Sequence, residues 1–155
     1  METGPDDEHF PAWCEVWATS QRADRPDDPP RPASDHVALG RRLLEPDGTH
    51  RAAVEGDAVV GALRLLFPLR DNPTVVHVDL AAHPGHRRQG VGSALLEEGA
   101  RVAAAAGRSS LIAEVDEPGP GAAGRGFALR HGWTCALEET AATRCSRRTR
   151  TGSRR

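Results

Sequence analysis

Apolar residues recur near the start of the chain at spacings that predict two helices. A first amphipathic helix is indicated by apolar residues three to four positions apart, namely Phe10, Trp13, Val16 and Trp17. The next segment, residues 25–32, contains four prolines and is incompatible with regular structure. Ser34 is a suitable N-cap for a second helix that runs to about Leu44. Its apolar positions are Val37, Leu39, Leu43 and Leu44.

The rest of the pattern predicts strands and helices in alternation. Gly56-Asp57 separates two strand patterns and has the residues of a hairpin turn. Gly107 follows the longest amphipathic stretch and is a natural C-terminal stop for that helix. We expect strands at 51–55, 58–66, 75–82, 110–115 and 134–139, helices at about 89–106 and 124–131, a turn at 71–73 and a loop at 118–121.

The connection after the strand at residues 75–82 carries the clearest chemical signal. Residues 83–93 read His-Pro-Gly-His-Arg-Arg-Gln-Gly-Val-Gly-Ser. Gly90 and Gly92 let the backbone approach a bulky anion because they carry no Cβ. The free N–H groups of the following helix and its dipole face the same point. Since Arg87 and Arg88 add positive charge, the stretch predicts a pyrophosphate site.

Two other phosphate-binding loops are excluded by the residues that they require. A Walker loop needs a lysine, whereas all 20 basic residues of this chain are arginine. A dinucleotide fingerprint needs a third glycine, where Leu95 stands. An ordinary strand–turn–helix connection is the remaining alternative. Pro84, Arg87 and the apolar run after Gly92 favour the anion site.

With these residues the chain resembles the GNAT superfamily of N-acetyltransferases. The family signature for acetyl-coenzyme A (acetyl-CoA) is Arg/Gln-x-x-Gly-x-Gly/Ala, and residues 87–92 follow it. The signature usually comes after a strand that ends in apolar-x-apolar-x-Pro, as residues 80–84 do here. Residues 125–133 are similar to the family's fourth helix and the motif that ends it. The similarity extends roughly from Phe10 to Glu139.

The resemblance implies an α/β (α+β) fold with a mixed, mostly antiparallel central sheet flanked by helices. The family's first and last strands have no apolar counterpart in this sequence. We therefore expect an acidic extension at 1–9, an acyl-CoA-binding domain at 10–140 and an Arg-rich, disordered tail at 141–155. Such an incomplete copy resembles the N-terminal half of a tandem two-domain protein. Unless the tail adds a poor strand, the open sheet edge invites homodimer formation.

The resemblance also implies which groups hold acetyl-CoA as co-substrate. Main-chain N–H groups of Leu80 and Ala82 are expected to face the pantetheine and the acetyl oxygen. Those of the first helical turn are expected to face the pyrophosphate. The residues expected to bind the cofactor are Leu80, Ala82, Arg87, Arg88, Gln89, Gly90, Val91, Gly92 and Ser93.

The resemblance assigns the catalytic groups less directly. Many relatives use a tyrosine of the fourth helix as the acid for the leaving thiolate, but this chain has no tyrosine and Ala128 stands there. Gly121 stands where relatives commonly have an asparagine. A general base with a pKa near the working pH suits the amine deprotonation. Its candidates, each with a structural role as the alternative, are Asp79, His77, Glu114 and Asp116.

Cysteine usage and hydropathy restrict the setting. Cys14, Cys135 and Cys145 are odd in number and far apart, which indicates neither a disulfide framework nor a zinc site. Cys14 and Cys135 are expected to be buried. His83 and His86 lack a third ligand, so no metal site is predicted. A membrane span needs ~18 apolar residues in a row, which this sequence lacks, and its acidic start is unlike a signal peptide. We expect a cytoplasmic protein.

Charge argues against a nucleic-acid-binding fold. The chain has 22 acidic and 20 basic residues, and six of the arginines fall in residues 141–155, which contain no acid. The rest of the chain is therefore acidic, whereas specific nucleic-acid binding needs a basic face.

Two functions from different classes follow. The first is an N-acetyltransferase that acetylates a primary amine of a small molecule or peptide. Asp24, Asp27 and Asp28 are suited to attract a cationic amine, with solvated loop acids as the alternative. The alternative is a non-catalytic acyl-CoA-binding or regulatory lobe.

Overall fold

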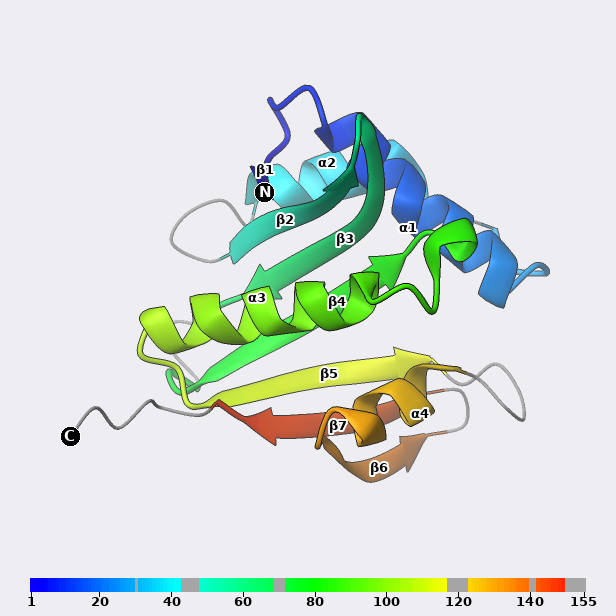
Figure 1. The fold of residues 1–155 in the computed structure, drawn as a ribbon. Helices are drawn as coiled ribbons and strands as arrows, with labels where there is room; N and C mark the ends of the chain where they lie inside the picture. Colours follow the sequence, from blue (N-terminus) through cyan, green and yellow to red (C-terminus); the bar gives the residue numbers. More distant parts are fainter. Residues whose placement is uncertain (30, 43–47, 69–71, 117–122, 140–141, 150–155) are drawn as a thin grey trace.

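The computed structural model describes residues 1–29, 31–42, 48–68, 72–116, 123–139 and 142–149. Its elements follow one another as Figure 1 shows. They are β1 (Glu2–Thr3), α1 (Phe10–Asp24), α2 (Ala33–Arg42), β2 (Gly48–Glu55), β3 (Ala58–Leu66), β4 (Val75–Ala82), the 3-10 turn η1 (Pro84–His86), α3 (Val91–Ala105), β5 (Ser110–Asp116), α4 (Ala123–Arg130), β6 (Thr134–Glu139) and β7 (Ala142–Arg148).

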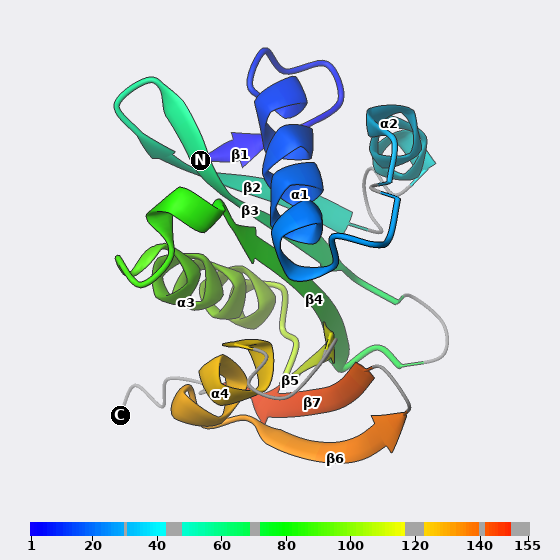
Figure 2. The same ribbon diagram turned by 90° about the vertical axis from the view of Figure 1, so that its right-hand side faces the viewer.

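The strands form one seven-stranded sheet in the order β1-β2-β3-β4-β5-β7-β6. All neighbours are antiparallel except β4 and β5, which are parallel. Helices α3 and α4 cover one face and α1 and α2 cover the other (Figure 2). The predicted fold class, a mixed and mostly antiparallel sheet flanked by helices, is confirmed.

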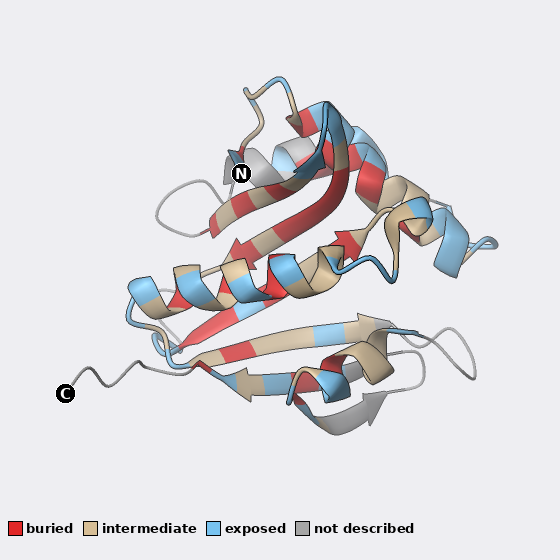
Figure 3. Cartoon of the chain, in the orientation of Figure 1, coloured by how far each residue is buried: buried red, intermediate tan, exposed pale blue. Residues whose placement is uncertain are grey.

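Each face of the sheet has its own hydrophobic core (Figure 3). The alternation of side chains along a strand sends Leu63 and Leu65 of β3 to the α3 face and Ala62 to the α1 face. The larger core comprises Leu63, Leu65, Val76, Val78, Leu95, Leu96, Ala103, Leu111, Ala128, Trp133 and Cys145. The smaller comprises Phe10, Trp13, Cys14, Val16, Ala52, Ala62 and Ala81.

Most predicted elements are confirmed, and β4 and β6 have the predicted bounds. Gly56 and Gly107 have φ of +59° and +72°, as the hairpin turn and the helix stop require. The N-cap assignment is wrong, because α2 begins at Ala33 and Ser34 lies inside it. The expected apolar side chains of the second helix, residue 71 of the turn and the loop at 118–121 lie outside the described residues.

The expectation of a disordered tail is wrong for residues 142–148, which form β7 between β5 and β6. Main-chain pairing with strands on both sides replaces the apolar content that the sequence lacks. Cys145 is fully buried, and Thr149 donates its hydroxyl to the Arg108 carbonyl at 2.7 Å. The sheet therefore has a last strand, and no position remains open between β5 and β6.

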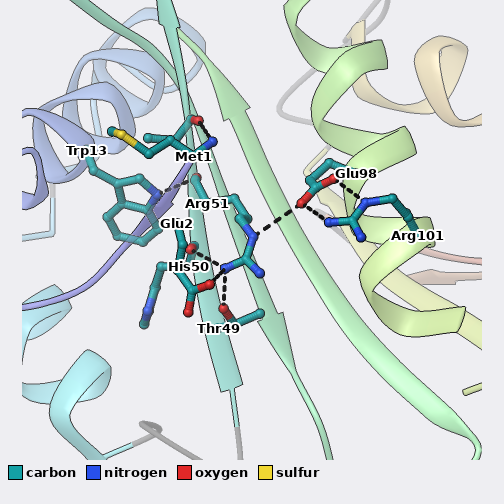
Figure 4. A network of polar contacts seen from close by, with 9 residues as sticks. Met1, Glu2, Trp13, Thr49, His50, Arg51, Glu98 and Arg101 are labelled. Carbon is teal, nitrogen blue, oxygen red and sulfur yellow. Dashed lines mark hydrogen bonds and ion pairs between the residues drawn. The ribbon is translucent and has the colours of Figure 1, made fainter. Parts of the chain in front are cut away.

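The first strand is also present, so residues 1–9 are not merely an acidic extension. The amino group of Met1 donates to the Ala52 carbonyl at 2.9 Å, and the Ala52 N–H donates back to the Met1 carbonyl at 2.7 Å. Arg51 holds this edge to the rest of the molecule (Figure 4). Its guanidinium contacts Glu2 at 2.9 Å and Glu98 of α3 at 3.3 Å.

The cysteine prediction is wrong in one respect. Cys135 and Cys145 face each other across β6 and β7 and form a disulfide. Sequence separation gave no sign of this pair, because Cys145 was assigned to a tail without structure. Cys14 is buried as expected, and burial raises the pKa of its thiol to about 11.

The outer strands of the sheet are β1 and β6. The predicted homodimer was inferred from missing end strands, and that premise is wrong. No helix among the described residues has the length and hydropathy of a membrane span.

Candidate functional site

The loop between β4 and α3 turns sharply at two residues with positive φ. Arg88 has φ of +64°, which is uncommon for a residue with a side chain, and Gly90 has φ of +88°. Gly90 is the N-cap of α3, and a Cβ there would meet no atom within 4 Å. Glycine is therefore suited to position 90 by backbone conformation rather than by space. We call residues 83–90 and the first turn of α3 the cradle.

The first turn of α3 presents main-chain donors to the cradle. The first helical hydrogen bond runs from the Ala94 N–H to the Gly90 carbonyl at 3.0 Å. Within the described part of the chain, the N–H groups of Val91, Gly92 and Ser93 have no acceptor. Such a row at a helix start also carries the positive end of the helix dipole, so the cradle suits an anion.

Two glycines set the position of α3, Gly61 of β3 and Gly92 of α3 itself. A Cβ on Gly61 of β3 would lie 2.6 Å from Val91 Cγ1, so this glycine lets α3 approach the sheet. A Cβ on Gly92 would lie 3.2 Å from the ring of Phe127 on α4. The space beside Gly92 therefore admits a helix–helix contact at the side of α3, not at its N–H groups.

Arg87 was expected to add positive charge to the cradle, but in the structure its side chain pairs with an acidic residue of α1. Its guanidinium contacts both carboxylate oxygens of Asp24, at 2.7 and 2.8 Å, and the Ser20 hydroxyl at 2.9 Å. Arg87 thus ties the cradle to the end of α1, and Asp24 is not a free anion for an amine. Arg88 is exposed, and Gln89 donates to the Gly85 carbonyl at 3.2 Å.

Strands β4 and β5 separate before either of them ends (Figure 1). Their parallel pairing covers Val75–His77 and Ser110–Ile112 only. The Thr74 carbonyl accepts from the Ser110 N–H at 3.0 Å, so every second residue of β4 from there directs its main-chain groups toward β5. Leu80 and Ala82 belong to this set and lie beyond the last paired residues. We call this opening the β4–β5 split.

The pairing with β3 leads to the same assignment. The His83 N–H donates to the Val60 carbonyl at 2.9 Å, which places the main-chain groups of residues 81 and 79 on the β3 side. Those of Leu80 and Ala82 then point the other way, into the split. On β5 the same alternation directs the main-chain N–H of Glu114 into the split, a donor that sequence reasoning missed.

The candidate bases lie on the α1 face of the sheet. Ala81 of β4 is in the core on that face, so Asp79 and His77, two and four residues before it, share the face. Ile112 pairs with His77, which places Glu114 of β5 there as well. Asp79 accepts two bonds from Arg64 on one oxygen, Oδ2, at 2.6 and 3.0 Å.

Glu114 contacts Arg144 of β7 at 3.1 Å. His77 is exposed, and no described group bonds to its ring. The side chain of Asp116 lies outside the described residues.

A histidine that directly follows α4 lies beside the cradle, whereas the position of the family's tyrosine is in the core. Ala128 is 5% exposed and belongs to the larger core. The His131 ring lies with its Nε2 3.1 Å from the Ser93 hydroxyl and packs on the Phe127 ring, with centroids 4.5 Å apart. Among the described residues, no group of three His, Cys, Asp or Glu is placed to hold a metal ion.

In this fold the main-chain donors of β4 that face the split and those of the first turn of α3 follow one another along residues 80–93. This arrangement is of the acetyltransferase type. The chain matches the model of the Acetyltransferase (GNAT) family over residues 10–133. That match covers more than half of the chain, so the protein belongs to the GNAT acetyltransferase family. The resemblance noted in the sequence is confirmed.

Individual relatives match over different lengths. A mycothiol acetyltransferase of Kocuria rhizophila is 36% identical over 81 residues, which are 52% of this chain and 26% of that protein. The solved tandem GNAT protein from the clavulanic acid biosynthesis pathway has a TM-score of 0.76 at 28% identity, over 88% of this chain and 43% of its own. This chain therefore spans less than half of either protein.

Another solved structure matches over nearly its whole length. The PaiA N-acetyltransferase of Thermoplasma acidophilum, solved in complex with coenzyme A, has a TM-score of 0.79 at 12% identity, with 96% of each chain covered. At that identity the likeness shows the fold alone.

Proposed function

We propose that this chain is an N-acetyltransferase that moves the acetyl group of acetyl-CoA to a primary amine of a small molecule or peptide. Family membership supports acetyl transfer. The observation that carries the coenzyme assignment is the series of main-chain N–H groups, unpaired among the described residues, at Leu80, Ala82 and the first turn of α3. The assignment of the acceptor as an amine rests on family membership. These donors follow one another along the chain and suit a long ligand with an anionic part.

The fit to acetyl-CoA rests on main-chain groups. The N–H groups of Val91, Gly92 and Ser93 would hold the pyrophosphate, and those of Leu80 and Ala82 would hold the pantetheine arm and the acetyl oxygen. Bound acetyl-CoA supplies a thioester, whose carbonyl carbon is open to attack by an amine. The chain's own contribution is to orient that carbonyl through fixed donors, which need no reorganisation during the reaction.

The chain must also accept a proton from the amine. His77 offers an imidazole without a described partner, on the face of β4 that carries Asp79. Asp79 offers Oδ1, because both bonds from Arg64 end on Oδ2. We assign the proton transfer to His77 or Asp79 before Glu114, whose exposed side chain lies on the far side of the split.

Coenzyme binding is tested by thermal denaturation with and without acetyl-CoA. We expect acetyl-CoA to raise the melting temperature and Gly92→Glu to abolish the rise, because a carboxylate beside the cradle repels the pyrophosphate. Gly92→Ala is the matched control, since it makes the same Cβ contact with Phe127 without adding charge. It should keep most of the rise. Equal melting of the folded wild-type protein with and without ligand would contradict the proposal.

A second candidate is a non-catalytic acyl-CoA-binding or regulatory lobe. The buried Ala128, in place of the tyrosine that many relatives use as an acid, favours it. An assay of thiol release with a broad panel of amines separates the two. Release above the rate of coenzyme hydrolysis supports the enzyme, and none across the panel supports the lobe.

A further inference from the structure

Three side chains on the α1 face of the sheet, one of which pairs with Asp79, form a buried or partly buried polar cluster that the proposed function does not use. We call Trp17 of α1, His36 of α2 and Arg64 of β3 the Arg64 cluster. The Arg64 guanidinium carbon lies 6.0 Å from the centre of the Trp17 ring. The Trp17 and His36 rings are stacked, with centroids 6.4 Å apart. The cluster lies on the α1 face of the sheet. Arg64 pairs across the strands with Asp79 of β4, which is the residue before Leu80.

The cluster holds hydrogen-bonding atoms without partners. His36 is 6% exposed, and its Nδ1 is buried and unbonded, as is the indole Nε1 of Trp17. The Arg64 side chain is 12% exposed and bonds to Asp79 through Nε and Nη2, and its Nη1 donors bond to no group among the described residues. Buried polar groups in proteins are almost always bonded, so two unbonded ring nitrogens, together with an unused guanidinium nitrogen, point to a ligand.

The chemistry of these atoms selects the ligand. Indole and guanidinium groups only donate hydrogen bonds. The His36 ring is neutral near pH 7, because burial and then the charges of Arg31 and Arg64 lower its pKa to about 4, against a smaller opposing effect of Asp35. A neutral imidazole can still donate one bond. A carboxylate accepts from all three groups, and it matches a guanidinium best.

The neighbouring carboxylate of Asp79 favours a ligand that also carries a positive charge. Its Oδ1 has no described partner, and its carboxylate already compensates the charge of Arg64. An isolated anion would be repelled by Asp79 and an isolated cation by Arg64. A ligand that carries an ammonium and a carboxylate close together satisfies both. The ammonium then lies at Asp79, next to the split, and the carboxylate lies toward α1 and α2.

We propose that the acceptor is an amino acid whose free carboxylate is bound by Arg64, Trp17 and His36, while its amine lies at Asp79. This inference rests on the proposed function. The reaction forms a bond between the amine nitrogen and the acetyl carbon and breaks the thioester C–S bond. The sulfur leaves as the coenzyme thiol, and of the two protons that the ammonium loses, one protonates the sulfur and the other goes to solvent through the base.

The test compares amino acids with the amines that differ only by loss of the carboxylate. Lysine and cadaverine, tyrosine and tyramine, histidine and histamine, and tryptophan and tryptamine form four such pairs. We expect one amino acid to exceed its partner about tenfold or more in kcat/KM, the effect of a charge-assisted hydrogen bond in a buried site. Thiol release from acetyl-CoA is the measurement.

Two variants assign the preference to the cluster. Trp17→Phe keeps an aromatic ring and removes one donor, so it should lower the ratio of kcat/KM between the amino acid and its amine about threefold or more. Arg64→Met should abolish the ratio. The matched control is Arg101→Met, which removes an exposed arginine that pairs with Glu98 on α3. Arg101→Met should leave kcat/KM unchanged for both the amino acid and its amine.

A binding titration keeps the inference testable if turnover is slow. Each member of a pair is titrated into the folded protein in the presence of coenzyme A, with heat or chemical-shift change as the readout. Tighter binding of the amino acid, lost in Arg64→Met, supports the inference. Equal affinity for both members, in a protein that acetyl-CoA stabilises, overturns it and leaves the proposed function intact. Absence of any acetyl-CoA stabilisation overturns both.

Discussion

The cradle at the start of α3 and the Arg64 cluster beneath α1 and α2 differ in the kind of atom that does the binding. The cradle presents main-chain N–H groups of three consecutive residues. The Arg64 cluster presents side chains from α1, α2 and β3, which are far apart in sequence. A main-chain site tolerates many side chains and depends on local conformation. A side-chain site depends on each residue and on packing over long distances.

This difference matches the two partners of the proposed reaction. In the proposal, a co-substrate shared by a whole family is held by main-chain groups, which depend least on the identity of the side chains. An acceptor that differs among members is held by side chains that a few substitutions can change. Arg87 links the two regions, because it belongs to the loop of the cradle and its side chain contacts Asp24 and Ser20 on α1.

The largest expected effect is on the α1 side. Trp13 is fully buried, and its indole N–H donates to the Arg51 carbonyl at 3.0 Å. Trp13→Ala should lower the free energy of unfolding by about 3–5 kcal/mol. Gln89→Ala, an exposed change in the cradle, should stay within about 0.5 kcal/mol. Urea denaturation measures both, and similar losses in the two variants would break the comparison.

Acid should weaken the α1 side through two histidines. Burial lowers the pKa of both His36 and His50 to about 4, from 6.5 in the unfolded chain. Between pH 6.5 and 4 the unfolded state binds protons that the folded state does not, so stability falls as pH falls. The slope approaches about 1.4 kcal/mol per pH unit for each histidine. Above pH 6.5 these groups contribute no slope.

Denaturation midpoints at pH 7, 6 and 5 measure this slope. His36→Phe removes one of the two groups and should roughly halve the slope. An unchanged slope in the variant would place the acid sensitivity elsewhere in the molecule.

The smallest expected effect concerns the link between the two regions. Asp24 is 45% exposed, and such an ion pair contributes about 0.2–1 kcal/mol. Because this pair ties the cradle to α1, its loss can cost coenzyme binding at most that energy. Arg87→Met and Asp24→Asn should therefore weaken acetyl-CoA binding to a similar extent, up to about fivefold. Equilibrium titration with acetyl-CoA is the measurement. If Arg87→Met weakens binding much more than Asp24→Asn, Arg87 leaves Asp24 and contacts the pyrophosphate directly.

Local patterns were sufficient where neighbouring residues decide the structure. The helix α1, the hairpin turn and the bounds of β4 follow from short-range preferences. The signature at residues 87–92 was found by its resemblance to a family motif, which is also a local pattern. The main-chain donors of the cradle were predictable for the same reason, since a helix start always leaves N–H groups unpaired.

Tertiary structure decided what depends on distant partners. Strand β7 has little apolar content and forms because β5 and β6 supply hydrogen bonds on both sides, which then brings Cys145 to Cys135. Arg64, Trp17 and His36 carried no sequence signal for a site, because nothing local marks side chains that meet only when α1 and α2 pack on β3. Sequence determined most of the elements and the glycine loop before α3. Packing determined the edge of the sheet and the side chains proposed to choose the acceptor, because their energies arise only from contacts between segments remote in the chain.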